Sequence, residues 1–304
     1  MLEGLDGKVA IITGAGRGLG RCHALELARQ GVRIVVNDLG RNRDGSPDDA
    51  ADQVVEEIRA LGGEAVSHLG DVADWDNAES MVQRAVAEFG SMDILVNNAG
   101  FLLDRMPFNM SEEEWDTIVR VHMRGHFVNI RHALTHWRTI AKAEGSVYGR
   151  IISTTSESGF HGAVGQVNYS AAKGGIIQLT IGASQALAKY GVTANAIAPR
   201  AHTAMTDDKE FMHKEEDGFK KYAPEHVSPL VAYLASPASQ PVNGRVFIVF
   251  GHQIDVLAAP VVAERFTVDH DWTPESVAEH LGPWFEGRPA GESFGFDLKA
   301  SSAL

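Results

Sequence analysis

Short apolar runs alternate along the chain with longer stretches in which apolar and polar residues recur at helical spacing. Runs such as Val9–Ile12 and Ile94–Val96 are apolar at every position, which is typical of strands that a parallel sheet buries on both faces. Regular alternation of such strands with helices predicts an α/β fold, a Rossmann-like doubly wound parallel sheet. About seven strands are predicted, over Val9–Thr13, Arg33–Asp38, Ala65–Gly70, Ile94–Asn97, Gly149–Thr154, Val192–Ala198 and Arg245–Val249.

Amphipathic helices are predicted between these strands, over Gly18–Gln30, Asp48–Leu61, Trp75–Phe89, Ser111–Lys142, Ser170–Lys189 and Pro224–Ala235. The chain continues well beyond the last predicted strand, and Thr273-Pro274-Glu275 has the composition of a helix start. We therefore expect a dinucleotide-binding domain over residues 1–257 and a C-terminal helical appendage, 258–304, packed on it.

Composition narrows the classes of partner and compartment. The formal net charge is -13 over 304 residues and no local run is purely basic, which argues against a nucleic-acid partner. No apolar run approaches the roughly 20 residues of a membrane-spanning helix, so no membrane partner is expected. The single cysteine, Cys22, cannot form an internal disulfide, and this favours a reducing, cytoplasmic location. No metal site is expected.

A glycine-rich loop joins the first predicted strand to the first predicted helix, with the sequence Thr13-Gly14-Ala15-Gly16-Arg17-Gly18-Leu19-Gly20. Glycines let a backbone approach a pyrophosphate closely, and the helix N-terminus supplies N–H donors to it. The spacing is T-G-x-x-x-G-x-G rather than G-x-G-x-x-G. The residues expected to contact the cofactor here are Gly14, Arg17, Gly18, Leu19 and Gly20.

Asp38 ends the second predicted strand, 18 residues after Gly20. A carboxylate there accepts hydrogen bonds from ribose hydroxyls and repels a 2′-phosphate, so NAD is preferred to NADP. Arg41 and Arg43 follow closely and offer the opposite possibility of a phosphate contact. A turn aspartate with no ligand role is the remaining alternative.

Two further loops follow the third and fourth strands. They contain Asp71-Val72, where the aspartate is placed to contact the adenine amino group, and Asn97-Asn98-Ala99-Gly100. Because ligands bind at the carboxyl ends of parallel strands, Asp71, Val72, Asn98, Ala99 and Gly100 are expected to line the cofactor site.

Tyr169 and Lys173 lie four residues apart, on one face of a predicted helix. A phenol titrates near pH 10, and a neighbouring ammonium lowers its pKa toward a useful base. Ser156 lies just after a predicted strand and is placed to hydrogen-bond a substrate oxygen. A surface Tyr–Lys pair is the plain alternative, but the serine and the glycine loop together make chance a poor explanation.

From Gly4 to about Leu257 the chain resembles the short-chain dehydrogenase/reductase family, which carries T-G-x-x-x-G-x-G, N-N-A-G and S…Y-x-x-x-K. The resemblance implies that Tyr169 is the acid/base, that Ser156 polarises the substrate and that Lys173 holds the nicotinamide ribose and joins a proton relay. His122 stands where many members have Asn, and its role is either in the relay or in packing. Pro199-Arg200 replaces Pro-Gly and shifts the register of Thr203; Pro199 and Thr203 remain expected nicotinamide contacts.

Within the family, the chain resembles the dehydrogenase domain of the peroxisomal D-bifunctional protein and its actinobacterial relatives. The resemblance is carried by Val36-Asn37-Asp38-Leu39-Gly40 with the polar insertion after it, V-H-x-R-G, Ile197-Ala198-Pro199, Pro224-Glu225-His226-Val227 and the tail that starts at Thr273-Pro274-Glu275. That resemblance implies a (3R)-3-hydroxyacyl-CoA dehydrogenase acting on fatty-acyl or steroid side-chain thioesters. The alternatives are a hydroxysteroid or other alcohol dehydrogenase on a CoA-free substrate, a 3-oxoacyl-carrier-protein reductase, which Asp38 disfavours, and a non-catalytic nucleotide-binding protein. The family also implies a homodimer or homotetramer. Residues Ala201–Tyr222, with apolar and basic side chains including Lys220 and Lys221, are expected to form a lid over an acyl-CoA.

Overall fold

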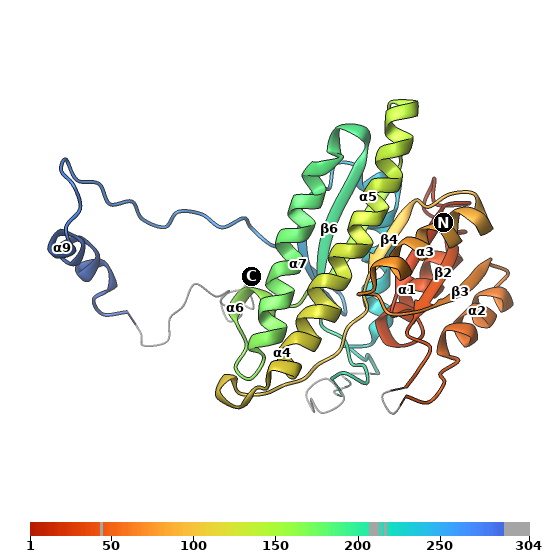
Figure 1. Cartoon of the computed structure of the whole chain (residues 1–304), viewed down its shortest axis with the longest axis horizontal. Helices are drawn as coiled ribbons and strands as arrows, with labels where there is room; N and C mark the ends of the chain where they lie inside the picture. Colours follow the sequence, from red (N-terminus) through yellow and green to blue (C-terminus); the bar gives the residue numbers. More distant parts are fainter. Residues whose placement is uncertain (43–44, 207–212, 214, 216–217, 289–304) are drawn as a thin grey trace. The chain divides into compact units, whose positions relative to one another are not determined.

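The computed structural model of the chain describes residues 1–42, 45–206, 213, 215 and 218–288. Eight strands form one sheet in the order β3-β2-β1-β4-β5-β6-β7-β8 (Figure 1). All neighbours pair in parallel except β7 and β8, which are antiparallel. The strands are β1 Val9–Thr13, β2 Arg33–Asp38, β3 Ala65–Leu69, β4 Ile94–Asn97, β5 Gly149–Thr154, β6 Val192–Pro199, β7 Val246–Phe250 and β8 Gln253–Val256.

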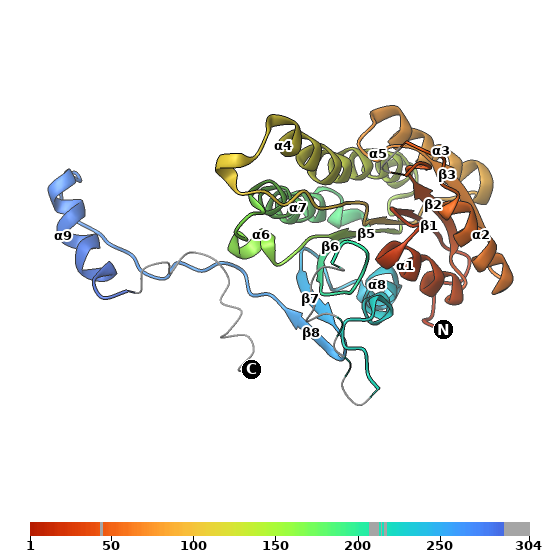
Figure 2. The same cartoon turned by 90° about the horizontal axis from the view of Figure 1, so that it is seen from below.

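Helices cover both faces of this sheet, as the doubly wound prediction requires. One layer contains α1, α2 and α8, and the other contains α3, α4, α5 and α7 (Figure 2). The helices are α1 Gly18–Arg29, α2 Ala50–Ala60, α3 Trp75–Phe89, α4 Glu112–Val119, α5 Gly125–Glu144, α6 Ser158–His161, α7 Val167–Ala186 and α8 Ser228–Ala235. Short 3₁₀ turns lie at Pro107–Asn109, Ala188–Tyr190, Pro224–Val227 and Pro237–Ser239.

Alternate residues of the central strands enter two separate apolar cores, because successive strand side chains point to opposite faces. Ile12 belongs to the core shared with α1, α2 and α8. Ile11 belongs to the other core, which also holds Trp137 of α5. Trp137 is completely buried, and its indole N–H donates to the carbonyl of Met92 at 2.6 Å. These two cores hold the carboxyl ends of β1 to β6 in fixed register, where the site residues lie.

The long helical stretch predicted over Ser111–Lys142 is not one α-helix. Ser111 caps α4 with a capping box to Glu114, and a π-helical turn, Arg120–Arg124, then joins α4 to α5. A π turn contains an additional residue per turn, so it alters which side chains face the sheet. His122 lies in this turn and is buried.

The chain divides into two compact units at Val256 and Leu257. Within the second unit, α9 spans Pro274–Phe285 and begins with a capping box formed by Thr273 and Ser276. The helix start predicted at Thr273-Pro274 is therefore confirmed, whereas the packing of this unit on the domain stays a prediction. Across the part of the chain that the structure describes, no helix is both long and apolar enough to cross a bilayer.

Candidate active site

The loop between β1 and α1 is packed so tightly that side chains would not fit. A Cβ on Gly20 would lie 2.2 Å from the carbonyl oxygen of Gly14, and one on Gly14 would lie 2.7 Å from the Cα of Ala99. Gly14 also has a φ of 61°, in the left-handed region. No side chain caps the first turn of α1, and that turn has no acidic residue. Its N–H groups are therefore available to an anionic ligand such as a pyrophosphate.

Asp38 at the end of β2 is tied to this loop. Its Oδ2 accepts from the amide of Gly16 and its Oδ1 from the amide of Leu39, both at 2.8 Å. The carboxylate therefore stands fixed beside the glycine loop. The guanidinium of Arg17 does not pair with Asp38; it forms an ion pair with Asp48 at 2.7 Å.

Arg41 and Arg43 are the two other basic residues that could contact a 2′-phosphate near Asp38. Arg41 forms an isolated antiparallel bridge with Pro47, while Arg43 lies outside the described residues. Leu19, also predicted to contact the cofactor, is partly buried and packs against the core on the α1 side of the sheet.

The N-N-A-G loop after β4 is joined to β1 by Thr13. The hydroxyl of Thr13 accepts from the amides of Asn98 at 3.0 Å and Ala99 at 3.1 Å. The side-chain amide of Asn98 donates to the carbonyls of Thr13 at 3.2 Å and Gly14 at 3.3 Å. These bonds hold the two loops together, and Thr13 was not among the predicted site residues. Its position directly before Gly14, at the start of the glycine-rich loop, could have indicated this role.

Asp71 and Val72 follow β3, as predicted. The Asp71 carboxylate accepts from Arg120 at 2.6 Å and from the amide of Ala73 at 2.8 Å. Val72 is buried, and a Cβ on Gly125 would lie 3.1 Å from its Cγ2. The ion pair to Arg120 thus connects the third strand's loop to the π turn.

Ser156, Tyr169 and Lys173 come together at the end of β5. The Lys173 ammonium donates to the carbonyl of Thr154 at 2.6 Å and lies 5.4 Å from the centre of the Tyr169 ring. Ser156 hydrogen-bonds the Tyr169 side chain, and its oxygen accepts from the amide of Ser158 at 3.2 Å. Three groups able to orient an oxygen and move a proton are therefore adjacent.

Electrostatics at this triad differ from the expectation that Lys173 lowers the pKa of Tyr169. Burial raises the pKa of Tyr169 to about 12, and the hydrogen bond from Ser156 only partly opposes that rise. Burial also lowers the pKa of Lys173 to about 7, so the ammonium is only partly charged at neutral pH. Desolvation therefore sets the direction of both pKa shifts in this structure.

His122 lies directly against the tyrosine. Its ring stands edge-on to the Tyr169 ring, with 5.2 Å between centres, and its Nε2 is 2.8 Å from the carbonyl oxygen of Phe101. Burial, followed by the nearby Lys173, holds its pKa well below 6.5, so the imidazole is neutral. Gly100 leaves room for it, since a Cβ there would lie 2.2 Å from His122 Cε1. His122 is thus both a packed histidine and a neighbour of the acid/base.

Pro199 ends β6, and Thr203 follows at the glycine loop, where a Cβ on Gly18 would lie 3.5 Å from its methyl group. Beyond Thr203 the predicted lid is described only in part; Lys209, Phe211, Met212 and Lys214 lie outside the described residues. Lys221 is described, and its ammonium lies 5.3 Å from the centre of the Phe250 ring.

One ion pair beside the triad was not predicted. Arg200 donates two hydrogen bonds, from Nε and Nη2, to the Glu157 carboxylate, each at 2.6 Å. Its guanidinium also lies over the Phe250 ring at 4.5 Å. The only signal in the sequence was that Arg200 stands where many family members have Gly, and this does not indicate that Glu157 is its partner.

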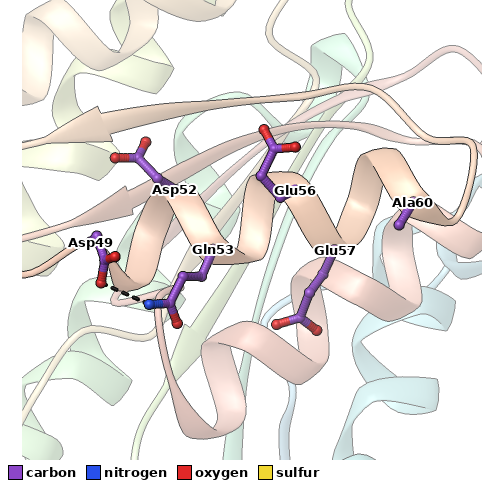
Figure 3. A pocket seen from close by; sticks show the side chains of 6 residues that line it. All are labelled: Asp49, Asp52, Gln53, Glu56, Glu57 and Ala60. Atoms are coloured by element: carbon purple, nitrogen blue, oxygen red, sulfur yellow. Dashed lines mark hydrogen bonds between the residues drawn. The ribbon is translucent and has the colours of Figure 1, made fainter.

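A surface hollow on α2 is acidic and lies outside this constellation (Figure 3). None of the residues lining it is a predicted site residue: they are Asp49, Asp52, Gln53, Glu56, Glu57 and Ala60. Glu57 is already paired with Arg21. Among the described residues, no cluster of histidine, cysteine, aspartate or glutamate side chains is arranged to hold a metal ion.

Comparison with known proteins places these features in a family. The family model described as short chain dehydrogenase matches residues 8–214. The chain is 47% identical over 295 residues to the hydroxyacyl-CoA dehydrogenase ChsB1 of Mycobacterium tuberculosis, covering 95% of this chain and 92% of that protein. It is 39% identical over 282 residues to the mouse peroxisomal multifunctional enzyme type 2, covering 90% of this chain and 36% of that protein. A crystal structure of a short chain dehydrogenase from Mycobacterium avium matches with a TM-score of 0.85 and 45% identity, covering 96% of this chain and 99% of that one.

Proposed function

The chain belongs to the short-chain dehydrogenase family and is an oxidoreductase acting on CH–OH groups, and from that premise we propose that it is an NAD-dependent (3R)-3-hydroxyacyl-CoA dehydrogenase. The observation that carries the proposal is the adjacency of Ser156, Tyr169 and Lys173 in a chain nearly half identical, along almost its whole length, to a hydroxyacyl-CoA dehydrogenase.

NAD, when bound, supplies the hydride acceptor, and the residues of the chain do the rest. The Ser156 oxygen accepts from Ser158 N–H, and its hydroxyl, which faces Tyr169, is placed to donate to the substrate oxygen when substrate is bound. Tyr169 exchanges a proton with that same oxygen, taking it during alcohol oxidation and giving it during ketone reduction. Lys173 stabilises the phenolate form when it is protonated. The neutral His122 packs edge-on to Tyr169 and restricts the ring's orientation.

The preference for NAD over NADP rests on Asp38. The amides of Gly16 and Leu39 hold its carboxylate at the end of β2, where the adenosine ribose is expected. A 2′-phosphate would meet this negative charge, while the guanidinium of Arg17 is already paired with Asp48. The rest of the predicted cofactor set fits a dinucleotide because the tight glycine loop leaves a side-chain-free surface at the start of α1.

A substrate panel tests the assignment. NADH formation is measured with (3R)- and (3S)-3-hydroxyacyl-CoA thioesters, the corresponding free acids and a CoA-free hydroxysteroid. We expect the (3R)-thioesters to have the highest kcat/KM, and Tyr169→Phe protein prepared in the same way to be nearly inactive. A clear preference for a CoA-free alcohol would refute the CoA assignment while leaving the oxidoreductase class intact.

Lys220 and Lys221, which precede the 3₁₀ turn η5 (Pro224–Val227), provide a second test of whether the substrate is a CoA thioester. Replacing Lys220 and Lys221 with alanine should raise KM for a CoA thioester and leave KM for a CoA-free alcohol unchanged, because only CoA carries phosphates. Lys189→Ala is a matched control, since its ammonium lies 4.8 Å from the centre of the Tyr190 ring, much as that of Lys221 lies 6.0 Å from the centre of the Tyr222 ring. Equal effects on both substrates would mean that the two lysines do not recognise CoA.

We also propose that the chain acts in the cytoplasm as a homodimer or homotetramer. The apolar side chains of α7 are spread around the helix: Ile176 is buried in the domain, whereas Ile177, Leu179 and Ile181 stay partly exposed. Trp115 of α4 and Phe127 of α5 are exposed as well. Pairing of these helices across a two-fold axis would cover that surface.

A further inference from the structure

The loop that carries Ser156 is held from two sides. On one side the hydroxyl of Ser158 donates to the side-chain carbonyl of Gln166 at 3.0 Å, and the Gln166 amide donates to Asp104 at 2.9 Å. On the other side Glu157, the residue directly after the serine, receives both hydrogen bonds from Arg200. Both attachments are on the two residues that directly follow Ser156, so they hold the turn that presents its hydroxyl.

The Arg200–Glu157 pair has the geometry of a rigid connection rather than of a solvated surface pair. Both hydrogen bonds are 2.6 Å, and the two side chains are only 26% and 15% exposed. A two-point Arg–carboxylate contact fixes orientation as well as distance. The Glu157 hydrogen bond also raises the pKa of Arg200, so the guanidinium stays charged.

Arg200 is in turn fixed to the sheet. Its amide donates to the carbonyl of Val249 at 3.1 Å, which continues the pairing of β6 and β7. Its guanidinium lies over the ring of Phe250, a residue only 3% exposed at the end of β7. A continuous set of contacts therefore runs from the buried end of β7 through Arg200 and Glu157 to the catalytic serine.

We propose that Arg200 and Glu157 are positioning residues, which act on the reaction by fixing the Ser156 hydroxyl against Tyr169 and the substrate oxygen. The inference rests on the role assigned to Ser156 in the proposed function. A displacement of about 1 Å in a reacting geometry can lower a rate by about 10²-fold, so losing this connection should be visible in kcat. The affinity for NAD should change far less than kcat, because most of the expected dinucleotide contacts lie in the glycine loop and at Asp38 rather than in the loop of Pro199 and Thr203.

The test uses Glu157→Gln, Arg200→Gln and the exchanged pair Glu157→Arg with Arg200→Glu, each made in the wild type and in Ser156→Ala. In the wild type, each single substitution should lower kcat by about 10-fold or more while the Kd of NAD changes far less, and the exchanged pair should recover part of the loss in kcat. In the Ser156→Ala protein the same substitutions should change kcat by less than about 2-fold, because two residues acting through one group are not additive.

A pH profile adds a measurement that a purely structural role would not move. The Ser156 hydrogen bond opposes the rise in the pKa of Tyr169. Arg200→Gln should therefore shift the limb of the pH profile on which alcohol oxidation rises with pH, the limb set by deprotonation of Tyr169, to higher pH, in the same direction as Ser156→Ala. Arg21→Gln is a matched control, since it removes another two-point Arg–Glu pair, to Glu57, and should leave kcat and the limb unchanged.

Three results would overturn the proposal. The first is that Glu157→Gln and Arg200→Gln lower kcat in the Ser156→Ala protein as much as they do in the wild type. The second is that these substitutions lower the melting temperature while kcat stays normal. The third is a rise in substrate KM confined to Arg200→Gln, which would mean that Arg200 contacts the substrate itself. The assay uses any alcohol that the wild type oxidises, so failure of the 3-hydroxyacyl-CoA assignment is seen separately, as turnover of another substrate.

Discussion

Lys173 should destabilise the folded protein while it serves the reaction, and replacing it with methionine should reveal that cost. The side chain is only 2% exposed, and burial lowers the pKa of its ammonium from 10.5 to about 7. A lysine pKa lower in the folded than in the unfolded chain means that folding disfavours the charged form. Methionine has a similar length and no charge, so Lys173→Met removes this penalty together with the catalytic group.

The magnitude follows from the two pKa values. At roughly 1.4 kcal/mol per pKa unit, a fall from 10.5 to about 7 corresponds to a penalty of about 5 kcal/mol. The Lys173 ammonium also donates to the carbonyl of Thr154, and losing that bond costs about 1–2 kcal/mol. The net gain in the free energy of unfolding for Lys173→Met is therefore about 3 kcal/mol wherever the penalty is fully present.

The sign of the pH dependence is fixed by the same values. Below the folded pKa of about 7 both states hold the proton and the wild type carries the full penalty. Between about 7 and 10.5 the folded lysine is neutral while the unfolded one is charged, so the penalty shrinks as pH rises. The advantage of Lys173→Met should thus be about 3 kcal/mol at about pH 6 and close to zero near pH 9.

Urea unfolding of the NAD-free protein at several pH values measures this difference. Lys142→Met, which changes an exposed lysine of α5, should show no comparable dependence on pH. The reasoning would be refuted if Lys173→Met were less stable than the wild type at low pH, or if its advantage did not change with pH. Lost turnover in Lys173→Met is expected in every case and does not decide the question.

The other predictions concern the cofactor, the acid/base, the histidine and the assembly. Tyr169→Phe should lower kcat by about 10²–10⁴-fold while calorimetry finds NAD binding unchanged, since only the proton-transfer group is lost. Asp38→Ala should weaken NAD binding by roughly 1.5–3 kcal/mol per lost hydrogen bond and narrow the gap to NADP; a wild type that prefers NADP would contradict this. Gly100→Ala should reduce turnover as much as His122→Ala does, because the added Cβ would displace the imidazole; normal kinetics would exclude His122 from the site. Light scattering should find a dimer or tetramer at micromolar concentration, and a monomer would reject the assembly.

The parts of the fold that depend on local pattern could be predicted from the sequence. The bounds of β1, β2, β4 and β5 agree with the prediction, because each of these strands, buried on both faces, contains a continuous apolar run. The strand β8 was not predicted, since its four residues, Gln253–Val256, are mostly exposed and carry a weak apolar signal. The π turn at Arg120–Arg124 was missed as well, because a local change of helical register leaves the residue types unchanged.

The same division applies to the candidate site. Motif spacing identified Ser156, Tyr169 and Lys173, and the structure brings these three together. The pairing of Arg200 with Glu157 depends on strand order, which joins residues 43 positions apart. The direction of the Tyr169 pKa shift depends on burial, a property of the whole fold, and the expectation from charge proximity alone was therefore wrong.

The antiparallel strand β8 has a consequence for the protein's solubility. Five of the strands in the sheet have both edges paired in parallel, and β7 has its outer edge covered by β8. The strand β7 is Val-Phe-Ile-Val-Phe, with no charge and no proline. Uncovered, it would offer a row of free N–H and C=O groups on an apolar strand, a template for association between molecules. The short β8, which places Asp255 opposite Ile248, instead ends the sheet with a strand that carries a charge. A chain shortened to end before Gln253 would keep every residue of the catalytic constellation and yet lose its protection against edge-to-edge aggregation.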